Sequence, residues 1–145
     1  MNPTRAIHCL VLLLALTTPV KATPSHATPC SALTRQVADL ERGGFAEVVL
    51  EDKGVLASGE TTAYRVYLRA GRMYGLMVGG CTDALDIDVT VQGPRGELIT
   101  GDNDDSRNAA LVLMPDRTGM YTITVMMWKA RGEGGHFAVS VAHGG

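Results

Sequence analysis

Short segments in which apolar and polar residues alternate follow one another over most of this chain. The longest is Met120–Trp128, and the same alternation occurs in Thr62–Leu68 and Leu85–Val91. Because successive side chains of a β-strand point to opposite faces, each segment predicts a strand with one buried face. Glycine- and proline-containing turns separate these segments, and no long helical pattern alternates with them. We therefore predict an all-β fold, an antiparallel, jelly-roll-like β-sandwich of seven or eight strands.

The same alternation predicts strand partners and a core. Thr62–Leu68 and Met73–Val78 are separated by a turn at Ala70–Gly71, which is typical of a β-hairpin. The apolar members of the alternating segments are expected to face inward. They are Tyr64, Val66, Leu68, Leu76, Leu85, Ile87, Val89, Val91, Leu111, Leu113, Tyr121, Ile123, Val125, Phe137 and Val139.

The start of the chain has the composition of a secretory signal peptide. Arg5 supplies a positive charge, an apolar run extends from Cys9 to Leu16, and small residues precede Thr23. The apolar run is too short to span a bilayer, so we expect a periplasmic or secreted protein without a membrane span. The predicted division is a signal peptide at 1–22, a disordered leader at 23–30, a short helix at 31–44 and the β-sandwich at 45–145.

The helix is predicted from the spacing of Leu33, Val37 and Leu40, which places them on one face. Ser31 is a suitable N-cap, and Gly43–Gly44 is a suitable end. Beyond the signal peptide the chain is acidic and contains no run of Lys or Arg. Nucleic acid and anionic membrane are therefore not expected as partners.

Two cysteines, Cys30 and Cys81, follow the predicted signal peptide. In an oxidising compartment two cysteines most simply pair, so we predict a Cys30–Cys81 disulfide. The alternative is that both remain free thiols.

A cluster of aspartates is the chain's most distinctive chemical feature. Two occupy the outer face of the Leu85–Val91 strand, and three follow Gly101 in a run of turn-forming residues. Crowded carboxylates repel one another unless a cation or hydrogen-bond donors compensate, and their oxygens suit calcium. We therefore expect calcium as a cofactor. The predicted metal ligands are Asp86, Asp88, Asp102, Asp104 and Asp105.

The aspartates also have a purely structural interpretation. They can serve as turn formers and as edge-strand charges that oppose aggregation. Arg107 can instead neutralise part of the cluster, which lowers the need for a cation.

Tyr67 and Trp128 are the candidate binding aromatics, although a core position for Trp128 at the end of its strand is the stronger interpretation. No serine lies in a nucleophile elbow, and His136 is interpreted as a surface histidine rather than a base. We predict no catalytic residues.

Several motifs follow one another in a characteristic order, namely Val66–Gly71, Tyr74, Asp86–Val89, Gly93–Gly96, Asp102–Asp105, Pro115 and Thr118–Tyr121. Their order resembles the bacterial pre-peptidase C-terminal domain family, relatives of the collagen-binding modules of secreted collagenases. The resemblance implies a non-catalytic β-sandwich, of a kind attached to secreted proteases and often associated with calcium. No peptidase accompanies it here, which leaves the family's usual targeting role open.

Two functions follow from these observations. The favoured one is an exported, non-catalytic binding or accessory module, calcium-stabilised, that presents an acidic edge to a protein, extracellular-matrix or cell-envelope partner. The alternative is a small secreted hydrolase or protease inhibitor that uses the same edge. A pocket joining the aspartates to His136 or Trp128 would favour the alternative. The sequence does not predict an oligomeric state.

Overall fold

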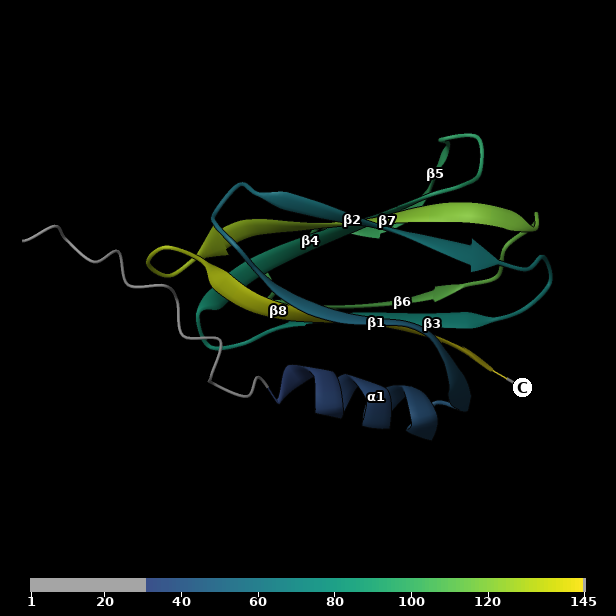
Figure 1. Ribbon diagram of the computed structural model, residues 1–145, viewed down its shortest axis with the longest axis horizontal. Coiled ribbons are helices and arrows are strands. Elements are labelled where there is room, and N and C mark those ends of the chain that lie inside the picture. The colour runs from purple at the N-terminus through teal and green to yellow at the C-terminus, as the bar shows by residue number, and fades with distance from the viewer. Residues whose placement is uncertain (1–30, 145) are drawn as a thin grey trace, which may run out of the picture.

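The structure, a computed structural model, describes residues 31–144. The predicted signal peptide (1–22), the leader (23–30) and Cys30 lie outside the described residues. One helix and eight strands follow in order (Figure 1). They are α1 (Ala32–Arg42), β1 (Phe45–Leu56), β2 (Thr61–Leu68), β3 (Tyr74–Gly80), β4 (Ala84–Gln92), β5 (Leu98–Asp102), β6 (Asn108–Leu113), β7 (Gly119–Ala130) and β8 (Gly135–Gly144).

The strands form two four-stranded antiparallel sheets that face each other as layers (Figure 1). The strand orders are β1-β8-β3-β6 and β2-β7-β4-β5. Consecutive strands thus mostly lie in opposite sheets, which is the arrangement of a jelly roll. The prediction of an antiparallel, jelly-roll-like sandwich with one short helix is confirmed.

The predicted hairpin of Thr62–Leu68 with Met73–Val78 is wrong. β2 pairs with β7, whereas β3 pairs with β6 and β8 in the other sheet. The turn between β2 and β3 contains Gly71, which has a φ of 73° and donates its backbone N–H to Pro115 O at 2.8 Å. Alternation identified both strands but carries no information on their partners, and this turn leads from one sheet to the other.

The core fills the space between the two sheets. The predicted inward-facing residues are buried, except that Tyr64, Leu85 and Leu111 are half-buried. Leu85 departs from the pattern because the β4–β7 register is irregular on both sides of Asp86. Strict alternation does not hold through such an irregularity.

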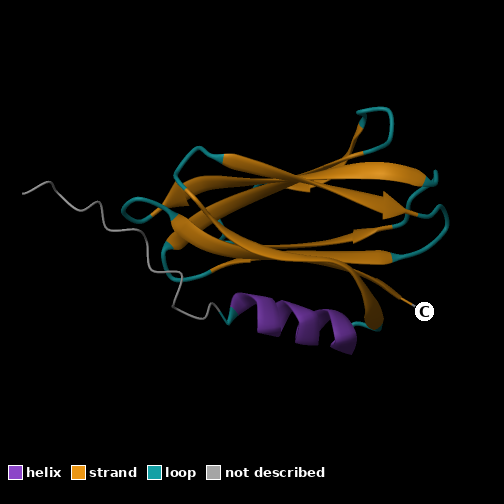
Figure 2. Cartoon of the chain, in the orientation of Figure 1, coloured by secondary structure: helices purple, strands orange, loops and turns teal. Residues whose placement is uncertain are grey.

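Helix α1 packs on the outer face of the β1-β8-β3-β6 sheet (Figure 2). Its buried side chains Gln36 and Leu40 lie one turn apart, opposite two glycines of β3. A Cβ on Gly75 would lie 2.6 Å from Leu40 Cδ2, and one on Gly79 would lie 2.4 Å from Gln36 Nε2. The glycines therefore allow the helix to approach this sheet closely. Within residues 31–144, no helix is long and apolar enough to cross a membrane.

Candidate functional site

In the described part of the chain, no helix covers the outer face of the β2-β7-β4-β5 sheet, and we call this surface the open face. Its centre is lined by short side chains, because Ala63 of β2 lies opposite Thr124 of β7, and Thr124 lies opposite Thr90 of β4. The alternate residues of these strands, such as Ile123 and Val125, are buried in the core. The open face thus consists of the outward-pointing residues of the same strands whose inward-pointing residues form the core.

The two candidate binding aromatics occupy opposite ends of the open face. Tyr67 lies opposite Met120 at the start of β7, and Trp128 lies near the end of that strand. At about 3.4 Å per residue, Met120 and Trp128 are about 27 Å apart along the strand. Tyr67 is 57% exposed and Trp128 is 59% exposed. The core position favoured for Trp128 is therefore wrong, because its side chain lies on the outward side of β7.

A groove of 410 Å³ crosses the open face, and we call it the acidic groove. Gly101 of β5 lies opposite Thr90, and a Cβ there would be 2.9 Å from Val89 O. Bare backbone at this position leaves a hollow beside β4. The side chains most relevant to its chemistry are Asp88, Thr90, Leu98, Asp102 and Met126.

The five predicted metal-binding aspartates lie within electrostatic range of one another. Burial raises the pKa of Asp88, and the charges of the other four aspartates raise it further. Burial also raises the pKa of Asp86, and the charges of Asp105 and Asp104 raise it further, whereas the charge of Lys129 lowers it. Lys129 was not predicted as part of this cluster; it lies opposite Asp86 across the irregular β4–β7 register.

Asp86 is the most deeply placed of these aspartates. Its side chain is 9% exposed, and its Oδ1 is buried without a hydrogen-bond partner. Asp102 Oδ1 accepts a hydrogen bond from the Asp104 backbone N–H at 3.3 Å, as the turn-forming interpretation of this segment implies. In the described part of the chain, no group of three or more His, Cys, Asp or Glu side chains is arranged to hold a metal ion. Calcium binding stays a prediction.

His136 forms a separate polar site with Asp83, which sequence reasoning did not identify. Asp83 accepts hydrogen bonds from the backbone N–H and from Nδ1 of His136. Burial raises the pKa of Asp83, but these hydrogen bonds outweigh it, and the pKa is lowered. His136 Nε2 is buried without a partner. Neither His136 nor Trp128 lines the acidic groove.

Cys81 is disulfide-bonded. Because Cys30 lies outside the described residues, its pairing with Cys81 stays a prediction.

No sequence signal linked Asp83 to His136, since the two residues are 53 positions apart.

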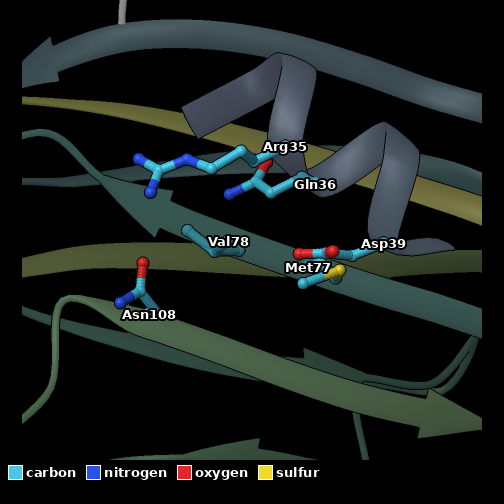
Figure 3. A pocket seen from close by; sticks show the side chains of 6 residues that line it. All are labelled: Arg35, Gln36, Asp39, Met77, Val78 and Asn108. Carbon is cyan, nitrogen blue, oxygen red and sulfur yellow. The ribbon is translucent and has the colours of Figure 1, made fainter. Parts of the chain in front are cut away.

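A second cavity, of 240 Å³, lies between α1 and the strands β3 and β6 (Figure 3). Gln36 faces it from the helix, and Asn108 borders it from β6. Gln36 Nε2 donates to Ala138 O at 3.2 Å, while its Oε1 has no partner. This cavity belongs to the contact between the helix and the sheet.

Comparison with known proteins shows a likeness in structure only. The chain matches no family of protein sequences and no curated protein. It is similar in structure to Aeromonas hydrophila PliG, a periplasmic lysozyme inhibitor of g-type lysozyme, with a TM-score of 0.50 and 22% identity. The alignment covers 68% of this chain and 88% of PliG. At this identity the likeness shows a shared fold.

Proposed function

We propose that this chain is an exported, non-catalytic module that binds a protein, and that it inhibits a cell-wall-lysing enzyme of the lysozyme class. The open face carries this proposal, because it presents two exposed aromatic side chains on a sheet that no helix covers within residues 31–144. Tyrosine and tryptophan are enriched in protein interfaces and among the residues that dominate binding energy. The fold shared with PliG, a lysozyme inhibitor, supports the choice of partner class.

The dimensions of the open face favour a macromolecular partner. Tyr67 and Trp128 stand at ends of the face that are about 27 Å apart, beyond the reach of a single small ligand. A protein can contact both at once, and it can cover the acidic groove between them. An inhibitor of this kind needs no catalytic group of its own, since it acts by occupying its target.

An inhibition assay tests this proposal. The exported chain, purified without its signal peptide, is added in increasing amounts to g-type and other lysozymes while cell-wall lysis is followed by turbidity. We expect lysis by at least one lysozyme to fall until the chain is equimolar with the enzyme. Size-exclusion chromatography of the same mixture should show a complex of the two proteins. Unchanged lysis and separate elution with every lysozyme tested would contradict the proposal.

A further inference from the structure

We propose that the acidic groove binds an arginine or lysine side chain of the partner protein, as the anchor of the complex. This inference rests on the proposed function, because it names the feature of the partner that the open face recognises. It is drawn from the charge, burial and shape of the groove.

No ion pair among residues 31–144 involves the carboxylates that line the groove. The ion pairs found within residues 31–144 involve other carboxylates, such as Glu97 with Arg95 and Asp116 with Arg117. None involves the five clustered aspartates. Two of these, Asp88 and Asp102, line the groove. Burial raises the pKa of Asp88, and the charges of its acidic neighbours raise it further, as expected where like charges lie close together.

Asp86 belongs to the same cluster of aspartates, although it does not itself line the acidic groove. It is 9% exposed, and its buried Oδ1 accepts no hydrogen bond. A buried acceptor without a donor is costly, and native structures contain few of them. Lys129 is the one cation whose charge lowers the pKa of Asp86. A second cation at the cluster, delivered by a partner, would offset the repulsion around this carboxylate as well.

The remaining lining of the groove suits a long cationic side chain. Leu98 and Met126 offer apolar contact for the methylene stem, and the hydroxyls of Thr61, Thr90 and Thr124 offer hydrogen-bond acceptors. A guanidinium or ammonium group can be held by one or two carboxylates. Calcium takes six to eight oxygens, and the described carboxylates do not converge in that way. The groove therefore fits a side-chain cation better than a metal ion.

Nuclear magnetic resonance of the exported chain tests the anchor without the partner. N-acetyl-arginine methylamide is titrated into ¹⁵N-labelled protein, and the citrulline analogue, which has the same shape without the charge, serves as the control ligand. We expect the arginine compound to shift the amide signals of Thr90, Gly101 and Asp102, and citrulline to leave them unchanged. Asp88→Asn should weaken the arginine titration about tenfold, equivalent to about 1.4 kcal/mol. Asp116→Asn, outside the cluster, should not.

The outcomes separate this inference from the proposed function. Arginine shifts that require Asp88, in a chain that binds no lysozyme, would support the anchor and refute the inhibitor function. The anchor alone would be overturned if Asp88→Asn and Asp116→Asn bound a lysozyme with equal affinity and the arginine compound caused no shifts. Shifts of equal size with citrulline, or shifts with calcium but not with arginine, would also overturn it.

Discussion

Asp86 and Asp88 illustrate what the sequence predicts at the scale of single residues. Alternation in Leu85–Val91 correctly identified a strand, and the density of acidic residues correctly indicated repulsion between Asp88 and its neighbours. The burial of Asp86 was not predictable, because it depends on an irregular register with Lys129. The Asp83–His136 pair was missed for a similar reason, since long-range contacts leave no local pattern.

Asp88→Asn is expected to stabilise the domain at neutral pH by a few tenths to about 1 kcal/mol, because it removes a like charge from the cluster. A carboxyl whose pKa is raised on folding destabilises the native state above its folded pKa, and this penalty disappears below its unfolded pKa. The advantage of Asp88→Asn over the unmodified chain should therefore shrink as the pH falls from 7 toward 4. Urea unfolding at several pH values measures this. Equal stabilities at pH 7 would contradict the repulsion.

Calcium binding by the aspartates has its own test. Calcium at about a hundred times its dissociation constant would stabilise the domain by about 2.7 kcal/mol, a rise in melting temperature of several degrees. The rise should be lost in Asp88→Asn and kept in Asp116→Asn. Thermal unfolding of EDTA-treated protein, with calcium or magnesium added back, measures it. Identical melting curves in all three conditions would contradict calcium binding and leave only the turn-forming and partner-binding roles of the cluster.

At the scale of elements, strands were predictable and their partners were not. β7 was recognised from its alternation, whereas β1 was not, because its pairing with β8 shifts register between Phe45 and Glu47 and between Val48 and Leu50. Helix α1 was recognised from its apolar spacing, but its place on the β1-β8-β3-β6 sheet depends on Gly75 and Gly79 of a distant strand. Nothing in the helix sequence indicates those partners.

Gly75→Ala is expected to destabilise the domain by about 1–3 kcal/mol, because the added methyl group overlaps Leu40 Cδ2. Removing that neighbour should relieve the overlap. The double variant Gly75→Ala/Leu40→Ala should therefore be more stable than the sum of the two single changes implies. Denaturant unfolding of the four proteins gives the coupling free energy. Strict additivity would show that the helix does not pack against Gly75 as described.

At the scale of the whole molecule, the jelly roll produces two different outer faces. One is covered by α1 (Figure 1). The other presents Tyr67, Trp128 and the acidic groove. The sequence predicted the sandwich and both aromatic candidates. It did not predict that they share one face, because that depends on the pairing of β2 with β7. We propose that a protein binds on this open face.

Calorimetric titration of a lysozyme that the chain inhibits tests this claim most directly. Trp128→Ala should weaken binding by about 2 kcal/mol, as expected for an exposed tryptophan that a partner protein buries. The matched control is Val112→Ala, which alters a side chain that is 65% exposed on β6 of the other sheet, and it should leave the affinity unchanged. Thermal unfolding should confirm that both variants are folded. Unchanged affinity for Trp128→Ala, or a loss of affinity confined to Val112→Ala, would contradict binding of the protein on the open face.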